Sequence, residues 1–124
     1  MIKEIRLITN AIKNSTCKEC LNITISQLKK NCTTPTILDL KAGSDKTFSG
    51  SQIGVCHNFS IDMNLPLDLK FQHLNNNGWK GELAFVYTKS NSFNCDPITQ
   101  WLDRKGKNGD SISSLIIKCK AAGN

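Results

Sequence analysis

The chain has 124 residues, is 39% hydrophobic and carries a formal net charge of +6. This length supports one modest hydrophobic core and excludes two independent domains. No stretch reaches the run of about 18 apolar residues that a membrane-spanning helix needs. The basic charge favours acidic partners in general, such as anionic glycans, membrane surfaces or nucleic acid. An aromatic content of 6% argues against a row of base-stacking side chains, so we expect no specific nucleic-acid partner.

Cysteine usage indicates an oxidising compartment. An even number of cysteines in a short chain predicts up to three disulfides, and the spacing leaves their pairing open. Four N-x-S/T sequons add a second sign of secretion. Residues 1–10 lack the apolar centre of a signal peptide, so we expect a mature form whose leader has been removed. The predicted disulfide cysteines are Cys17, Cys20, Cys32, Cys56, Cys95 and Cys119, and the predicted glycosylation sites are Asn14, Asn22, Asn31 and Asn58.

The first part of the chain predicts a peripheral segment followed by short strands. The apolar residues of the first twelve positions fit a helical period only in part, so they could form a short amphipathic helix or an irregular arm. Because this segment precedes the first cysteine, residues 1–16 are predicted to form an N-terminal extension outside the core. Alternation from Leu21 to Ser26 predicts a half-buried strand. We then expect a loop over 27–35, a strand over 36–40 and a turn over 41–50.

The second part predicts more strands and one hairpin. Apolar residues over 53–63 suggest strands on either side of Cys56. Alternation over 67–71 and again over 81–87, around a polar turn at 75–78, is typical of a β-hairpin. We expect loops over 90–101 and 103–110 and a closing strand over 112–119. Short strands separated by turns predict an all-β Greek-key sandwich or barrel, held by disulfides, in a single domain over 17–124.

The sequence offers few residues in the patterns that chemical sites require. Cys17 and Cys20 have the spacing of half a zinc site, but the histidines that could complete it are distant in sequence, so disulfide use is favoured. His73, beside a polar turn, is predicted to be an exposed surface residue. No pattern of nucleophile, base and orienting carboxylate stands out, so we expect a non-enzymatic protein with no cofactor and no metal. Two basic patches are candidates for binding, Lys29-Lys30 and Arg104-Lys105-x-Lys107. The predicted binding residues are Arg104, Lys105 and Lys107, with Trp101 beside them.

The central residues resemble the Greek-key motif of the βγ-crystallin superfamily. Trp79-Lys80-Gly81 and the later Ser113-Ser114 are similar to its aromatic, glycine and distant serine. The resemblance implies that Gly81 adopts a positive φ where a hairpin folds over the sheet, that Trp79 covers the turn, and that a serine hydroxyl bonds the folded hairpin.

The cysteine pattern narrows this resemblance. Cys17-Lys18-Glu19-Cys20, Cys95 and the closing ISSLIIKC are similar to secreted schistosome egg glycoproteins of the crystallin fold, which implies a host-directed effector or immune modulator binding an extracellular protein or glycan. The last two cysteines are also similar to plant antimicrobial and killer-toxin proteins, which implies a toxin acting on cell envelopes. The latter likeness implies that Cys119 is tied to the region near Cys17 and Cys20.

A second resemblance is to PLAT domains, which are lipid-associating β-sandwiches. It rests on Phe59-Ser60-Ile61-Asp62, on Leu69-Lys70-Phe71-Gln72-His73, on Gly78-Trp79 and on Trp101-Leu102-Asp103. It implies association with a lipid surface. An inhibitor that acts through an exposed loop is a further alternative.

Overall fold

A computed structural model describes residues 1–12, 15–37, 39–75, 77–103 and 112–122. Within these ranges no helix has the length and apolar character needed to cross a membrane. The elements are β1 (Ile2–Thr9), β2 (Leu21–Gln27), β3 (Lys30–Thr33), β4 (Asp45–Ser49), the 3-10 helices η1 (Gly50–Gln52) and η2 (Gly54–Asn58), β5 (Leu67–His73), β6 (Trp79–Thr88), β7 (Ser92–Cys95), β8 (Trp101–Leu102) and β9 (Ser114–Ala121).

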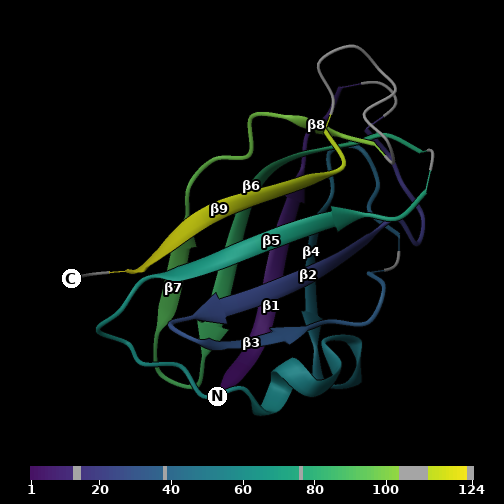
Figure 1. Ribbon diagram of the computed structural model, residues 1–124. Helices are drawn as coiled ribbons and strands as arrows, with labels where there is room; N and C mark the ends of the chain where they lie inside the picture. Colours follow the sequence, from purple (N-terminus) through teal and green to yellow (C-terminus); the bar gives the residue numbers. More distant parts are fainter. Residues whose placement is uncertain (13–14, 38, 76, 104–111, 123–124) are drawn as a thin grey trace.

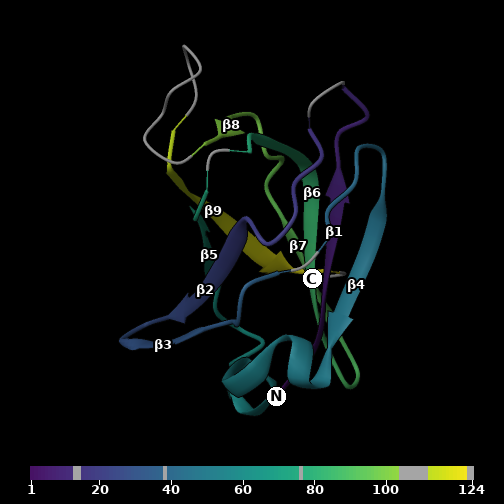
Figure 2. The same cartoon turned by 90° about the vertical axis from the view of Figure 1, so that its right-hand side faces the viewer.

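The strands form one curled antiparallel sheet in the order β3-β2-β5-β9-β7-β6-β1-β4, with β8 paired to β6. In Figures 1 and 2 the strands β3, β2, β5 and β9 lie in one layer, and β6, β1 and β4 cross behind them in a second. The pairing of β7 with β9 joins the two layers on one side. The all-β, disulfide-bonded fold predicted from the sequence is therefore confirmed.

The core lies between the two layers and is built by alternation along each strand. Leu21, Ile23 and Ile25 of β2 are fully buried, while the residues between them are half exposed. The rings of Phe71 and Trp79 meet there with centroids 5.9 Å apart. Burial of such large side chains stabilises the fold by about 1.5–3 kcal/mol each.

The prediction that residues 1–16 lie outside the core is wrong, because β1 is an interior strand of the sheet. It pairs with β4 on one side and with β6 on the other. A register shift between Ile2 and Glu4 places both Ile2 and Ile5 in the core. That irregularity gives a spacing of three where a regular strand gives two, which explains why the sequence pattern looked partly helical.

The predicted hairpin over 67–71 and 81–87 is also wrong, although both strands exist. β5 pairs with β2 and β9, whereas β6 pairs with β1, β7 and β8. The chain therefore crosses from one layer to the other between them. Alternation of apolar residues identifies a strand and its buried face, but it does not identify the strand beside it.

Several boundaries also differ from the expectation. The loop over 27–35 contains β3, the turn over 41–50 contains β4, and the loop over 90–101 contains β7. The segment over 53–63 forms η2 in place of strands. In the described part of 36–40, Ile37 and Leu40 make isolated bridges. The strands β3 and β4 each bury a single side chain, so they carry too little alternation to be recognised. The strand over 21–26 and the closing strand are confirmed.

All six predicted cysteines form disulfides, which pair Cys17 with Cys20, Cys32 with Cys56, and Cys95 with Cys119. The implied link from Cys119 to the Cys17–Cys20 region is wrong, because Cys119 lies opposite Cys95 in the β7–β9 ladder. Cys32 ties the edge strand β3 to η2. Three disulfides indicate a protein of an oxidising compartment.

Candidate functional site

The residues of the crystallin-like motif serve the core. Gly81 does not have a positive φ; a Cβ there would lie 2.3 Å from the Trp79 ring, so glycine is needed for close packing. The Trp79 indole donates to Thr9 Oγ1 at 3.1 Å. The carbonyl of Ser113 accepts the backbone N–H of His73, and Ser114 lies opposite Gln72 in the ladder. The expected positive φ of Gly81 is therefore wrong, while the family resemblance itself stays a prediction.

The predicted binding patch lies largely outside the described residues. Arg104, Lys105 and Lys107 belong to the segment over 104–111, of which the structure gives no description. Trp101 is half-buried in β8 opposite Lys80. It lines a hollow of about 610 Å³ at the end of the sandwich. Its role as a binding residue stays a prediction.

A second end of the molecule exposes apolar side chains. Leu28, Val55 and Met1 are 82%, 70% and 66% exposed, the highest values among the exposed large hydrophobic residues described. They lie in the β2–β3 turn, in η2 and at the N terminus. Figures 1 and 2 both place these three segments in the lower part of the molecule. We name this region the apolar end.

Leu28 is held in an unfavourable backbone conformation. Gln27 lies opposite Lys30, so β2 and β3 are joined by a two-residue turn of Leu28 and Lys29. Leu28 has φ of 56°. Glycine is preferred at the first position of such turns, and a bulky residue with positive φ is a genuine outlier. Neither packing nor turn chemistry explains a leucine here, and such outliers cluster where a protein binds.

The turn is fixed to the body of the protein by the Gln27 side chain. Its Nε2 donates to the carbonyls of Asp62 and Leu65 at 2.8 and 3.2 Å, and its Oε1 accepts the Asp62 N–H at 2.7 Å. These bonds hold β2 against the segment that leads into β5. Leu28 is therefore presented on a rigid support.

Replacing Gln27 by alanine is expected to lower the free energy of unfolding by about 1–3 kcal/mol, because the Asp62 N–H and two carbonyls lose their partner in a part-buried site. Urea denaturation measures the change. Gln52→Ala is the matched control, since its side chain makes an exposed bond to Ser49. An equal decrease in the free energy of unfolding for both variants would show that the part-buried hydrogen bonds of Gln27 contribute no more than an exposed one.

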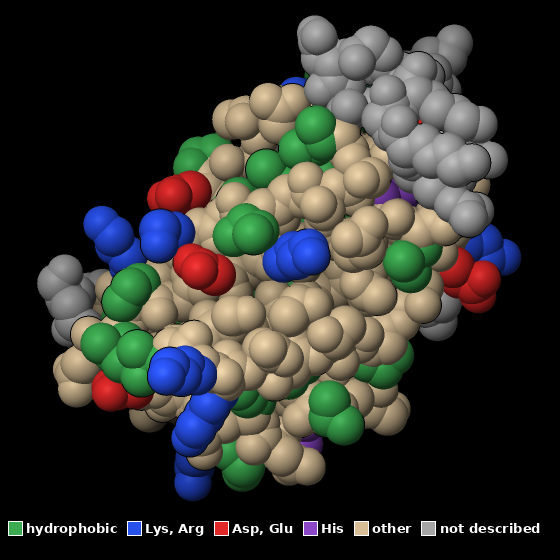
Figure 3. Space-filling view, viewed as in Figure 1, with side chains coloured by type: hydrophobic (Ala, Val, Ile, Leu, Met, Phe, Trp, Pro, Cys, Tyr) green, Lys and Arg blue, Asp and Glu red, His purple; other side chains and the backbone are tan. Residues whose placement is uncertain are grey.

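The apolar end is also basic. Lys29 and Lys30 directly follow Leu28, and all three line a hollow of about 710 Å³ with Ile61 and Asp62. In Figure 3, Lys and Arg side chains gather at the lower left, where Figure 1 places the β2–β3 turn. An exposed leucine next to two lysines combines apolar contact with attraction for anions.

A different surface lies on the outer face of β1 and β6. Arg6 forms an ion pair with Asp45, with Nε 2.8 Å from Oδ1, and its guanidinium lies 5.1 Å from the centre of the Phe85 ring. The hydrogen bond to Asp45 raises the pKa of Arg6 and lowers that of Asp45. A register shift in β6 next to Gly81 turns Phe85 and Tyr87 outward. The charged and aromatic side chains of this face therefore contact one another, so they do not form a candidate binding site.

His73 is buried, with 2% exposure, which makes the expected surface position wrong. It lies at the end of β5 beside the Cys17–Cys20 disulfide. Burial lowers the pKa of His73, while the nearby backbone of Asn77 and Asn75 and the charge of Asp103 act in the opposite direction. The fold thus brings together the zinc-like pair and the histidine that the sequence left far apart.

The glycosylation sequons have different surroundings. Asn31 in β3 and Asn58 at the end of η2 are exposed, and Asn22 in β2 is half-buried. Asn14 lies outside the described residues. Their modification stays a prediction.

Leu28 was missed by sequence reasoning, although a signal exists. Gln27-Leu28-Lys29-Lys30 sits between two strands with no glycine or asparagine in the turn. A turn that lacks its usual residues and carries an aliphatic side chain is a local conflict, and such conflicts concentrate at functional sites.

Comparisons with known proteins identify a fold but no family. No family model matches the chain, and no curated protein sequence matches it. Crystal structures of a lipoxygenase deletion variant, with and without arachidonate, are similar to it with a TM-score of 0.62 and 11% identity. The match covers 95% of this chain and 16% of the lipoxygenase chain, within its PLAT-like part. At this identity the likeness shows a shared fold alone.

Proposed function

We propose that this protein is a secreted, non-enzymatic binding domain that docks on anionic membrane surfaces through its apolar end. The observation that carries the proposal is Leu28, which is 82% exposed and has φ of 56°. The strained backbone and the exposed side chain both disfavour the free protein, and insertion of the side chain into a lipid interface would offset both.

The neighbouring charges define the surface. Lys29 and Lys30 stand beside the leucine, so they would meet phosphate headgroups as the side chain enters the interface. Each lysine near an anionic leaflet contributes about 1 kcal/mol. The net charge of +6 favours the same kind of surface.

The proposal is tested by sedimentation with vesicles of phosphatidylcholine, with and without phosphatidylserine. Leu28→Gly is expected to weaken binding by about tenfold or more, since a buried leucine contributes about 1.5–3 kcal/mol. The same change relieves the positive φ, so the melting temperature should stay level or rise. Improved stability together with lost binding is a result that simple damage to the fold cannot produce.

Two further variants serve as controls, one that removes the charges of the turn and one that changes an exposed apolar residue elsewhere. Lys29→Gln with Lys30→Gln should weaken binding to the anionic vesicles and reduce its dependence on salt. Ile116→Ser is the matched control, because Ile116 is 61% exposed on the outer face of β9, away from the turn. Unchanged binding of Leu28→Gly, or equal binding to neutral vesicles, would contradict the proposal.

The expectations of a host-directed effector or immune modulator and of an envelope toxin stay predictions. The same vesicles separate the toxin from the docking domain, because a toxin should release a trapped dye and a docking domain should leave the vesicles intact. Capture of one extracellular protein or glycan by both wild type and Leu28→Gly would favour the effector.

A further inference from the structure

Three potential metal ligands meet at the start of β2. A ligand atom from each of Cys17, Cys20 and His73 lies within 4.8 Å of the others, and all three residues are buried. Neither ring nitrogen of His73 makes a hydrogen bond of normal geometry among the described residues, although backbone atoms of Asn75 and Asn77 lie close enough to raise its pKa. An unsatisfied buried imidazole is costly, so its position calls for an explanation that packing does not supply.

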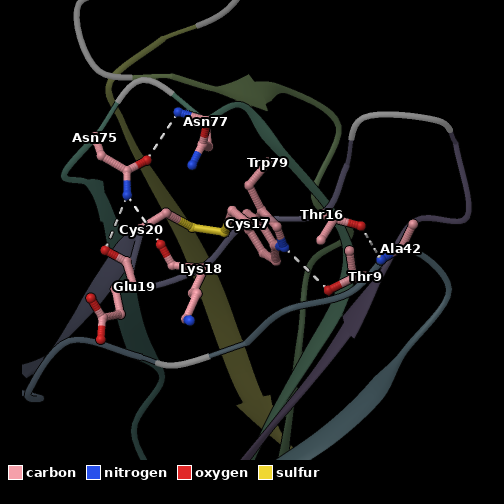
Figure 4. The surroundings of a disulfide bond; sticks show 10 residues. All are labelled: Thr9, Thr16, Cys17, Lys18, Glu19, Cys20, Ala42, Asn75, Asn77 and Trp79. Atoms are coloured by element: carbon pink, nitrogen blue, oxygen red, sulfur yellow. Dashed lines mark hydrogen bonds between the residues drawn. A yellow bond between two sulfur atoms is a disulfide. The ribbon is translucent and has the colours of Figure 1, made fainter.

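The backbone around the cysteines is held without help from the disulfide. Cys17 exchanges two backbone hydrogen bonds with Leu40, at 2.8 and 2.9 Å, and the carbonyl of Cys20 accepts the Leu74 N–H at 2.7 Å. Asn75 Nδ2 donates to the carbonyls of Lys18 and Glu19 between the two cysteines. Figure 4 shows this amide reaching into the turn. The two sulfurs would therefore stay close together if the bond between them were opened.

The histidine is fixed from the other side. The N–H of His73 donates to the Ser113 carbonyl at 2.8 Å, and His73 lies opposite Leu21 in the β2–β5 ladder. Its partner residue Leu21 directly follows Cys20. Cys17 and Cys20 thus lie in the segment that leads into β2, and His73 lies in β5, the strand paired with β2. These fixed positions give the group the rigidity that a metal site needs.

We propose that Cys17, Cys20 and His73 form a zinc-class metal site whose two sulfur ligands are the sulfurs of the Cys17–Cys20 disulfide, so that disulfide and bound metal are alternative states of one place in the fold. Two thiolates and one imidazole are typical zinc ligands, and they leave a fourth tetrahedral position for water or another ligand. This site is independent of the apolar end.

The exchange between the states is balanced. A dithiol reductant gives two electrons and two protons to the disulfide, leaves the cysteines as thiols and becomes a disulfide itself. Zinc then displaces both thiol protons to solvent and takes the lone pair of the neutral imidazole. Neither Cys32–Cys56 nor Cys95–Cys119 belongs to a group of possible metal ligands among the described residues, so the exchange is expected at one disulfide only.

The test is refolding of the fully reduced chain in a glutathione redox buffer, with or without excess zinc, followed by native mass spectrometry. Without zinc we expect three disulfides. With zinc we expect one metal ion per chain and two disulfides, and alkylation with peptide mapping should place the two free thiols at Cys17 and Cys20 after the metal is removed. Three disulfides and no metal, or free thiols at other cysteines, would overturn the proposal.

Variants and a spectroscopic probe separate a built site from random thiol binding. Cobalt should give the ligand-field bands of a tetrahedral ion with a thiolate-to-metal charge-transfer band. His73→Ala should weaken cobalt binding by about tenfold or more while the other two disulfides still form. Cys17→Ser with Cys20→Ser should abolish it. Cobalt binding of unchanged strength in His73→Ala would rule out the three-ligand site, and should that variant fail to fold, the thiol mapping in the wild-type chain decides alone.

Discussion

Replacing Gly81 by valine is expected to lower the free energy of unfolding by about 3 kcal/mol, at the upper end of the range for overpacked cores. A Cβ at this position would lie 2.3 Å from Trp79 Cη2 and 2.7 Å from Ile98 Cδ1, and both side chains are buried. The indole cannot move aside without giving up its hydrogen bond to Thr9. Urea denaturation followed by tryptophan fluorescence and circular dichroism measures the loss.

Gly50→Ala separates this clash from the general effect of losing a glycine. Gly50 has φ of +55° and nothing within 4 Å of an added Cβ, so only the backbone strain of about 1–2 kcal/mol applies. Combining Gly81→Ala with Trp79→Leu should cost less than the sum of the single changes, because the shortened side chain no longer meets the added methyl group. Strict additivity would show that the close approach to Trp79 is not the reason for a glycine at this position.

Removing either long-range disulfide is expected to cost about 3 kcal/mol, as the constraint on the unfolded chain is lost. Cys32–Cys56 and Cys95–Cys119 both span 24 positions in sequence, so the effect on the unfolded state is nearly the same for the two. Any difference between the double alanine variants therefore reports on the folded state. Thermal and urea denaturation measure both.

The folded-state effects of the two bonds should differ in location. Cys95 and Cys119 lie opposite each other in a ladder whose hydrogen bonds remain, whereas Cys32 is the link between edge strand β3 and η2. Without Cys32–Cys56 we expect faster amide exchange in β3 and η2 and unchanged exchange in β5 and β9. Uniform acceleration across the sheet would show that β3 is held by the rest of the structure.

The sequence was sufficient to predict the position of those strands whose side chains on one face are all buried. In β2 and β5 the buried residues recur at every second position, and both strands were found close to their observed bounds. In β1 a register shift disturbs the same pattern, so an interior strand looked like a peripheral arm. The sequence could not predict which strands pair. For example, β5 and β6 follow each other in the chain but lie in different layers. Partners depend on the packing of the whole sheet, and period alone does not encode it.

For the candidate sites too, the sequence shows which residues are present, but only the fold shows which of them lie together. The cysteines were identified by their number, yet the neighbourhood of His73 and the Cys17–Cys20 pair arises only when β5 lies beside β2. The exposure of Leu28 depends on a tight turn between β2 and β3, within a segment expected to be a loop. The missing glycine or asparagine in this turn is a signal in the sequence, but it can be interpreted only when the backbone conformation of Leu28 is known.

The position of Asn31 has a consequence for how the protein is prepared. This sequon residue is exposed in β3, directly after Lys30 and three residues after Leu28. An oligosaccharide attached to it would stand as a bulky hydrated spacer between the basic turn and any flat surface. Material from a host that does not glycosylate and material from one that does would then differ in adhesion while sharing one fold. Enzymatic removal of the sugar would bring the adhesion of the glycosylated material to that of the other.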